Sequence, residues 1–317
     1  MKRLLFALLL AGCEGESVTA GFEEPVRVIN GQFQEGTLPG APPLTPDEVA
    51  AGVEPESPRV TAVDGIGGIL RFGDPRQTIR GRASNDAVAV AFRFEDLGSG
   101  YWIDPVRGPD ALNAGEFTWS FDAQFSRALP VGRHRLLFAA VDAEGRAGTE
   151  LDVALCAASE VPDNDNACLP TQKPPALVIS LAWDLNADID LQVRMPDGLL
   201  VDPKHPVAAP VGGDAASALG HLDLDSNSAC LIDGVRRENL IFAQPPPSGT
   251  YAIYANLFEA CAKPSVRFTA TIHMPAEGEQ PGAFQQVEVF RASGTLLASQ
   301  ANADAKLGLF VGKFVVP

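Results

Sequence analysis

The sequence predicts an all-β protein with two β-sandwich domains in tandem, placed after a disordered N-terminal tether. In both halves of the 317-residue chain, apolar residues alternate with polar ones over short stretches, which is the period of a half-buried strand. Clusters of Gly, Pro, Asn and Asp separate these stretches, and no stretch has sustained helical periodicity. A chain with 46% hydrophobic and 20% charged residues is globular in composition, and its length suits two ordinary domains.

Residues 1–12 are predicted to be the signal peptide of a lipoprotein. Lys2 and Arg3 form a basic start, and the apolar run 4–10 is too short to span a bilayer, which takes about 20 residues. The letters LAGC, which end at Cys13, resemble a bacterial lipobox. That resemblance implies that Cys13 is lipidated and attaches the mature chain to a membrane, and that Glu14 favours the outer membrane. An ordinary secretory signal with a chance cysteine is the alternative.

Residues 13–58 are predicted to be a flexible tether. They are rich in Gly, Pro and Glu, and such a segment cannot bury enough apolar surface to offset the entropy lost on ordering. The letters PVRVING, residues 25–31, could still add a local strand. We therefore expect a segment that holds the folded domains away from the membrane surface.

The charge of the chain argues against nucleic-acid binding. The formal net charge is −16, and removal of the signal peptide with Lys2 and Arg3 makes it −18. No cluster of Lys and Arg opposes this acidity, so a phosphate backbone would find no basic surface. The acidity suits an exported protein, including one that uses divalent cations.

Residues 59–155 are predicted to form the first sandwich. In AVAVAFRFED, residues 87–96, one face of a strand carries Val88, Val90, Phe92 and Phe94. The segment EFTWSFD alternates in the same way, with Trp119 among its inward residues. The closing segment GRHRLLFAAVDAEGRAGTELDVAL resembles the C-terminal hairpin of bacterial Ig-like domains. This resemblance implies an Ig-like sandwich of about 100 residues.

Four cysteines remain besides Cys13, and an oxidising compartment favours disulfides between them. The expected pairs are Cys156–Cys168 and Cys230–Cys261, because each lies within one organisational unit. The first pair would close the Pro-rich linker 156–176. In the loop-entropy model each bridge contributes roughly 3–4 kcal/mol. Zinc binding is the alternative, but no pair has the C-x₂₋₄-C spacing of zinc sites.

Residues 177–317 are predicted to form the second sandwich. LVISLAWD and IDLQVRMPDG alternate, with Ile189, Leu191 and Val193 inward and Asp190 and Gln192 outward in the second segment. NADIDLQVRMPDG, a later LDLD, and PSGTY before a strand together resemble secreted bacterial domains of the pre-peptidase C-terminal type. That family resemblance implies a jelly-roll-like, non-catalytic accessory or binding module, sometimes with bound calcium.

Acidic and amide residues in two segments form a candidate calcium site. Side chains that alternate along an extended segment share one side, so their oxygens can converge. Calcium takes 6–8 oxygen ligands, more than either segment alone would give. The candidate ligands are Asp184, Asn186, Asp188, Asp190, Asp223, Asp225 and Asn227. The alternative is that these residues form turns and solvated loop tips.

The second acidic segment is not an EF-hand. Asp223, Asp225 and Asn227 match the first three ligand positions of that loop. Ser228 then stands in place of the required glycine, and Gly234 in place of the bidentate glutamate. Only an irregular loop site is compatible with the sequence.

Known catalytic motifs are absent from the sequence. It contains no H-E-x-x-H, no G-x-S-x-G, no P-loop and no dinucleotide-binding glycine pattern. We therefore predict a lipid-anchored envelope protein without catalytic residues, which presents its second sandwich to a protein or polysaccharide. The alternative is a secreted hydrolase or an enzyme-accessory domain, with a site near His205 beside Asp202 and Lys204.

Overall fold

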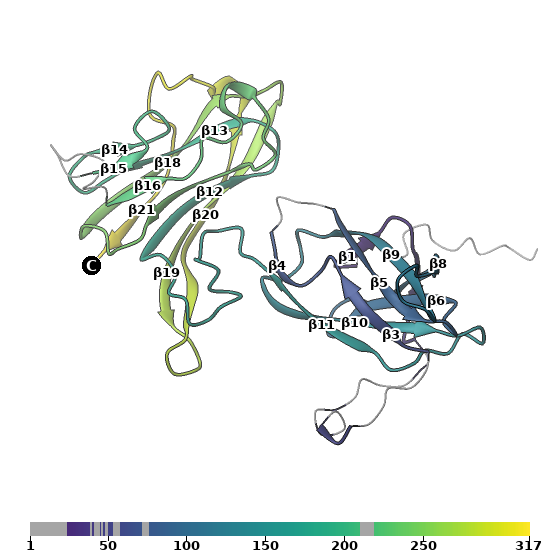
Figure 1. The fold of residues 1–317 in the computed structure, drawn as a ribbon. Coiled ribbons are helices and arrows are strands. Elements are labelled where there is room, and N and C mark those ends of the chain that lie inside the picture. The colour runs from purple at the N-terminus through teal and green to yellow at the C-terminus, as the bar shows by residue number, and fades with distance from the viewer. Residues whose placement is uncertain are drawn as a thin grey trace, which may run out of the picture. The chain divides into compact units, whose positions relative to one another are not determined.

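The computed structural model describes residues 24–38, 40, 45, 47, 50–52, 58–71, 76–209 and 219–317. The described chain consists almost entirely of strands and turns. It divides into two compact units, and the second unit consists mainly of Leu155–Pro317. Each unit is a pair of packed β-sheets (Figure 1). The predicted all-β class with two β-sandwiches is therefore confirmed. The predicted signal peptide and Cys13 lie outside the described residues.

The N-terminal half of the chain contains two sheets, most of whose strands belong to the first unit. One has the order β1-β9-β5-β3, with β8 also paired to β9, and the other has the order β2-β7-β6-β10-β11-β4. The strands are β1 (Val26–Val28), β2 (Gln32–Glu35), β3 (Val60–Asp64), β4 (Gly68–Leu70), β5 (Gln77–Ser84), β6 (Ala89–Phe94), β7 (Gly100–Pro105), β8 (Gly108–Pro109), β9 (Glu116–Phe125), β10 (Gly132–Val141) and β11 (Leu151–Ala157).

Aromatic side chains form the core between these sheets. Phe92 of β6 meets Phe121 of β9 edge-on, with ring centroids 4.9 Å apart, and stacks on Phe138 of β10 at 5.4 Å. Trp119 is also buried, as its place in the alternation predicts. Val88 is an exception to the predicted pattern, because it precedes β6 and is 46% exposed. The inward alternation of β6 therefore begins at Val90.

Two short strands lie within the range 13–58, which is predicted to be a tether. β1 pairs with β9 and β2 pairs with β7, so these strands extend the two sheets of the first unit. Val26 and Val28 are each 2% exposed, and the Trp102 indole donates a hydrogen bond to the Val26 carbonyl oxygen. The local alternation in PVRVING thus specifies a strand within a segment whose average composition favours disorder.

The second unit also contains two sheets. A six-stranded sheet has the order β15-β16-β17-β12-β19-β20, and a four-stranded sheet has the order β14-β13-β18-β21. The elements are β12 (Leu177–Trp183), β13 (Asp188–Arg194), β14 (Leu200–Val201), β15 (Val207–Ala208), β16 (Gly220–Leu222), η2 (Ser228–Cys230), β17 (Arg237–Phe242), β18 (Gly249–Glu259), β19 (Ser265–Glu277), β20 (Phe284–Leu297), η3 (Ala298–Gln300) and β21 (Leu309–Val316).

The core of the second unit lies between these sheets, and β13 shows how the sequence sets it. Ile189, Leu191 and Val193 are all fully buried in this core, as their alternation predicts. Asp190 and Gln192 point away from the core, but both are only 2% exposed. Their outward direction agrees with the predicted alternation, but another segment of the chain covers this face of β13. The loop between η3 and β21 contacts this face, since the Gly308 amide donates to Gln192 Oε1 at 2.9 Å.

Both predicted disulfides are confirmed. Cys156 is bonded to Cys168 in the linker, and Cys230 of η2 is bonded to Cys261 after β18. The second bond fixes a long loop to the end of β18, beside the start of β13. Within the described residues, no helix has the length and apolar character needed to cross a bilayer.

Candidate metal centre

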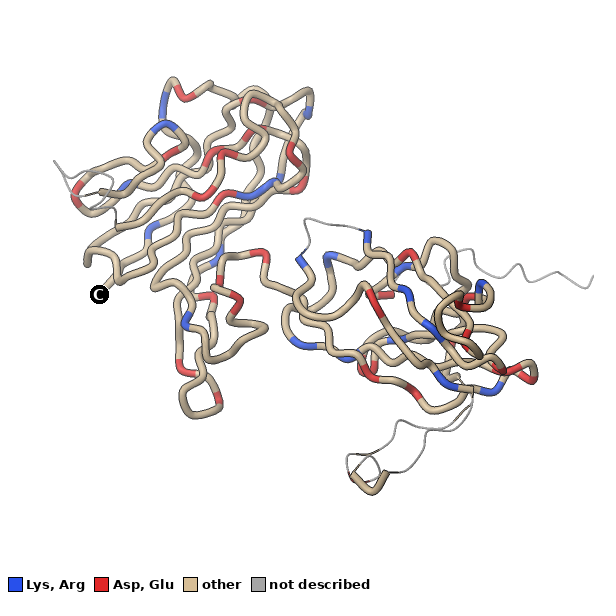
Figure 2. The backbone as a smooth tube through the Cα atoms, in the orientation of Figure 1, with Lys and Arg blue, Asp and Glu red and all other residues tan. Residues whose placement is uncertain are grey.

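The start of β13 places two aspartates on the outer face of the four-stranded sheet. Because Ile189 points into the core, Asp188 and Asp190 point outward together. The pairing register with β18 shifts between Asp188, opposite Glu259, and Ile189, opposite Leu257. Such irregularities bend a strand and redirect side chains at sites of function. Figure 2 shows further acidic positions on the loops at this end of the second unit.

The loop after β16 brings a third aspartate to this face. Its backbone turns sharply, since Asn227, Ala229 and Cys230 all have positive φ, which is uncommon for residues with a side chain. The Ala229 amide donates to Asp188 Oδ2 at 2.6 Å. The buried Asn227 side chain donates to the Ala187 carbonyl oxygen at 3.1 Å. These contacts and the Cys230–Cys261 bond hold the loop over β13.

Asp188, Asp190 and Asp225 form a compact cluster, which we call the acidic cluster. One carboxylate oxygen from each lies within 4.8 Å of the others. Asp188 and Asp190 are each 2% exposed, whereas Asp225 is exposed. The Asp188 Oδ1 atom is buried and has no hydrogen-bond partner among the described residues. A buried carboxylate oxygen in this state is unfavourable unless a cation or another donor reaches it.

Burial and mutual repulsion make the anionic forms of these groups unfavourable. Burial, with smaller contributions from Asp225 and other acids, raises the pKa of Asp188 to about 7. Burial, followed by the charges of Asp304 and Asp188, raises the pKa of Asp190 to about 8. No lysine, arginine or histidine in the described part of the chain forms an ion pair with either residue. No basic side chain of the described residues therefore neutralises the charge of Asp188 or Asp190.

Glu238 of β17 is a fourth acid beside this cluster. It is fully buried, and its two oxygens accept hydrogen bonds from the Leu191 amide at 2.7 Å and the Ser226 amide at 3.1 Å. Burial, followed by the charge of Asp190, raises the pKa of Glu238. Glu238 satisfies backbone donors of both segments that carry the acidic cluster. Its role is to hold those segments together.

Asp304 and Asn256 join the site from positions that the sequence analysis did not identify. Asp304 lies in the loop between η3 and β21, where Asn256 of β18 donates to its Oδ1 at 2.6 Å. Asn256 also donates to Asp190 Oδ2 at 3.2 Å, and Lys204 lies 3.1 Å from Asp304 Oδ2. Alternation gives no signal for Asp304, because the residue lies in an irregular loop with positive φ at Ala303 and Asp304.

The other four candidate ligands lie outside the acidic cluster and have other contacts. Asp184 accepts from the Arg267 amide at 3.0 Å, and Asp223 caps the backbone and side chain of Asn239. Asn227 Oδ1 accepts from the Asp233 amide at 3.1 Å, while Asn186 is exposed. The structure thus brings together three of the predicted residues, Asp188, Asp190 and Asp225, from both predicted segments.

The donor set of the acidic cluster fits calcium best among common metals. Three carboxylates supply up to six oxygens, and calcium accepts monodentate or bidentate carboxylates with water in the remaining positions. No histidine or cysteine contributes to the cluster, and these are the ligands that zinc prefers. The unpartnered Asp188 Oδ1 is the atom whose environment a bound cation would complete.

His205, the residue on which the hydrolase alternative depends, lies in an open turn. Its Nδ1 atom is 3.0 Å from Asp202 Oδ1, and its side chain is 70% exposed. This pair is three residues apart and closes a local turn, in which the His205 amide also donates to Asp202 Oδ1. His205 does not line the cavity described below. The geometry gives the hydrolase alternative no support.

Comparisons with known proteins do not place this chain in a family. No family model matches it, and no curated protein does. Among solved structures, the C-terminal domain of the AgI/II polypeptide BspA of Streptococcus agalactiae has 8% identity and a TM-score of 0.24, covering 73% of this chain and 95% of that one. A second structure named BspA_C_WT has the same identity and TM-score, covering 73% of this chain and 96% of that one.

A third similar chain belongs to a structure of manganese lipoxygenase of Gaeumannomyces graminis with a partial structure of zonadhesin of Komagataella pastoris. It has 9% identity and a TM-score of 0.19, and the match covers 80% of this chain and 99% of that one. Similarities of this size identify neither a family nor a function. The functional argument therefore depends on the geometry of the second unit.

Proposed function

We propose that this protein is a lipid-anchored component of the bacterial cell envelope and that its second sandwich is a calcium-stabilised, non-catalytic binding module. The ligand of the module is an extracellular protein or polysaccharide. Calcium neutralises the acidic cluster and joins β13 to the loop that carries Asp225. The module then presents a fixed set of loops at one end of the sandwich.

The observation that carries the proposal is the buried, unneutralised carboxylate of Asp188. Its Oδ1 atom has no partner in the described structure, and the other two acids of the acidic cluster come from β13 and from the loop after β16. A buried charge without a partner of opposite sign strongly destabilises the folded state. A bound cation would supply that partner for the acidic cluster. Among cations that prefer oxygen ligands, calcium tolerates the most flexible geometry, which suits carboxylates from two separate segments.

The envelope location is supported by the sequence and by the cysteines. Two disulfides are typical of exported proteins, and the lipobox-like start suggests a lipid anchor at Cys13. The anchor has its own test. The wild-type chain should be found in the membrane fraction of cells, and the Cys13→Ser variant should not. A wild-type chain that is entirely released from membranes would contradict the anchor.

Thermal melting of the full chain tests the calcium site. At a calcium concentration 100 times Kd, binding adds about 2.7 kcal/mol to the free energy of unfolding. For a unit of this size that is a rise in Tm of roughly 5–10 °C relative to chelator. The Asp188→Asn variant should lose most of this rise. Magnesium should replace calcium poorly, because it demands stricter octahedral geometry.

Glu279→Gln is the matched control for Asp188→Asn. Glu279 is an exposed acid in the turn between β19 and β20, so the substitution removes the same charge from the same unit. This variant should keep the full calcium response. Identical melting of the wild-type chain in calcium and in chelator would reject the metal centre.

A further inference from the structure

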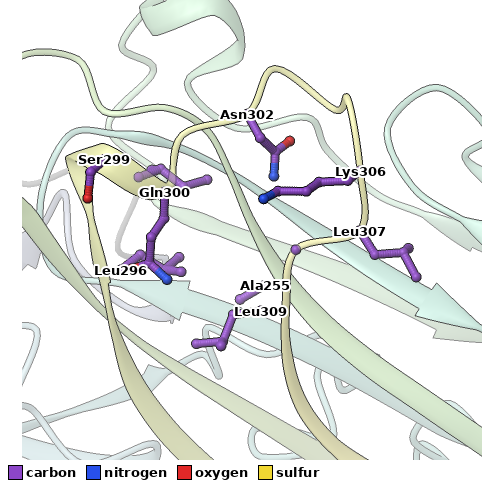
Figure 3. Close-up of a pocket in the computed structure, with 10 residues that line it drawn as sticks. Ala255, Leu296, Ser299, Gln300, Asn302, Lys306, Leu307 and Leu309 are labelled. Carbon is purple, nitrogen blue, oxygen red and sulfur yellow. The ribbon is translucent and has the colours of Figure 1, made fainter.

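The second unit has a cavity outside the acidic cluster that no part of the proposed function uses. Its volume is about 290 Å³, and it lies between β18, the end of β20, η3 and the loop that leads into β21. Apolar side chains from β18 and β20, among them Leu257 and Leu296, line one side. Polar side chains of η3 and the loop line the other. Figure 3 shows Lys306 and Asn302 extending over the cavity from the loop.

The polar side of the cavity consists mainly of hydrogen-bond donors. Lys306 forms no ion pair with any described residue. Gln300 Oε1 accepts from the Leu297 amide at 2.7 Å, which fixes the side-chain amide and leaves its NH₂ group without a described partner. Ser299 adds a hydroxyl that also has no partner in the described structure. One cation, several neutral donors and the buried Asn302 Oδ1 atom, an acceptor without a partner among the described residues, therefore surround an apolar floor.

Asn302 links this cavity to the acidic cluster. Its side-chain NH₂ donates to Asn256 Oδ1 at 2.6 Å, and Asn256 in turn donates to Asp304 and Asp190. The wall that carries Asn302 is thus fixed by side chains that also border the acidic cluster. Lys306 belongs to the same loop as Asp304, so its position depends on that network.

We propose that this cavity binds an acidic sugar residue of the uronic-acid type. Its carboxylate pairs with Lys306, because a charge-assisted hydrogen bond to an otherwise unpaired ammonium group is the strongest contact that the cavity offers. Ring hydroxyls accept from Gln300 and Ser299, and the apolar face of the ring packs on Leu309, which lines the cavity and is 41% exposed. The volume lies at the lower end of the range for ligand pockets, about 300–1,000 Å³, and so suits one sugar ring.

This inference rests on the proposed role of the second unit as a binding module and narrows its ligand to an acidic polysaccharide. A neutral sugar would leave Lys306 without a counter-charge, and a cationic ligand would be repelled by it. A simple anion such as acetate would leave the apolar floor uncovered. A neutral sugar and a simple anion can therefore be used as probes to distinguish these alternatives from an acidic sugar.

Calorimetric titration of the full chain, in calcium, tests the assignment with D-glucuronate as the probe. We expect D-glucose and acetate each to bind at least about tenfold more weakly than glucuronate, since one lacks the charge and the other lacks the ring. The Lys306→Met variant should weaken glucuronate binding by about tenfold or more. Its Tm in calcium should stay unchanged, because Lys306 is exposed.

Lys313→Met is the matched control, because it removes an exposed lysine of the same unit that does not line the cavity. It should leave glucuronate affinity unchanged. No measurable glucuronate binding, equal binding of glucose or acetate, or an unchanged affinity in Lys306→Met would each overturn the assignment. A calcium-dependent Tm without glucuronate binding would reject this inference and leave the calcium module standing, so the two failures are distinguishable.

Discussion

Glu150 in the first unit and Asp188 in the second are both acids on sandwiches of similar architecture, but their surroundings differ. Arg93 holds Glu150 with two parallel hydrogen bonds of 3.0 and 3.1 Å. Asp188 is more deeply buried, yet its Oδ1 atom has no partner and its neighbours are other acids. The first unit also pairs Glu116 with Arg82 at 2.8 Å. These two acids of the first unit are paired with arginine, whereas the acidic cluster of the second unit has no ion pair with a described basic residue.

The comparison shows that acidic residues of this chain occur in two different electrostatic environments. In the first unit, the ion pairs complete themselves within the fold and require nothing from solution. In the second unit, Asp188, Asp190 and Asp225 lie on one face without an ion pair to a described base, which is unfavourable for their charged forms unless a cation or protons neutralise them. Three changes would break or sharpen this comparison.

Removal of the Cys230–Cys261 disulfide should have the largest effect. This bond holds the loop in which Ala229 donates to Asp188 and Asp225 completes the acidic cluster. We expect the Cys230→Ser/Cys261→Ser variant to lose roughly 2–4 kcal/mol of stability. Its calcium Kd, measured by titration, should rise at least about tenfold, because positive φ at Ala229 and Cys230 is no longer enforced.

The linker disulfide supplies the matched comparison. The Cys156→Ser/Cys168→Ser variant should also lose stability, since it opens a closed loop, but it contains no residue of the acidic cluster. Its calcium Kd should stay within about twofold of the wild-type value. Equal losses of calcium affinity in the two variants would mean that general destabilisation, and not loop position, sets the affinity.

Stability in chelator should fall as pH rises, which is opposite to the usual behaviour of paired carboxylates. Burial, followed by neighbouring acids, raises the pKa of Asp188 from 3.8 to about 7 and that of Asp190 to about 8. The folded protein therefore retains protons that the unfolded chain releases above pH 3.8, and this stabilisation is lost as pH rises through 7 and 8. We expect the Tm in chelator to be several degrees lower at about pH 8 than at about pH 5.

Calcium should reverse this dependence, because it binds the deprotonated carboxylates. Melting curves at both pH values, with calcium and with chelator, provide the measurement. The Asp190→Asn variant is the control, since it removes one titrating group and should flatten the fall in chelator. A Tm in chelator that rises between the two pH values equally in wild type and variant would show that the acidic cluster does not control the pH response.

The sequence predicts the sandwich fold and part of the site, for reasons visible in particular residues. Alternation identifies Ile189, Leu191 and Val193 as core residues, because a strand with one buried face has an apolar residue at every second position. It also brings Asp188 and Asp190 to one side. It cannot show that a loop from far along the chain covers that side, so it does not predict the burial of Asp190.

Distant contacts explain the remaining differences. Asp225 joins the cluster, whereas the Asp223 carboxylate accepts from Asn239 instead. Asn227 lies where the chain turns, with φ at 60°, and its Oδ1 atom accepts from the Asp233 amide. Asp304 reaches Asn256 through a loop that has no pattern of its own. Strand alternation is local information, whereas the cover over β13 is made by residues that only the folded topology brings close.

Breaking the arginine pair in the first unit should have the smallest effect and should not depend on calcium. The Arg93→Met variant leaves Glu150, whose side chain is 11% exposed, without its bidentate partner. We expect a loss of about 1–3 kcal/mol, which calorimetry detects as a Tm lowered by equal amounts in calcium and in chelator. Arg80→Met is the control, since Arg80 is an exposed arginine of the first unit with no ion pair to a described residue. If Arg93→Met instead reduced the calcium response itself, the two units would share one electrostatic system, and the contrast between self-paired and cation-requiring acids would not hold.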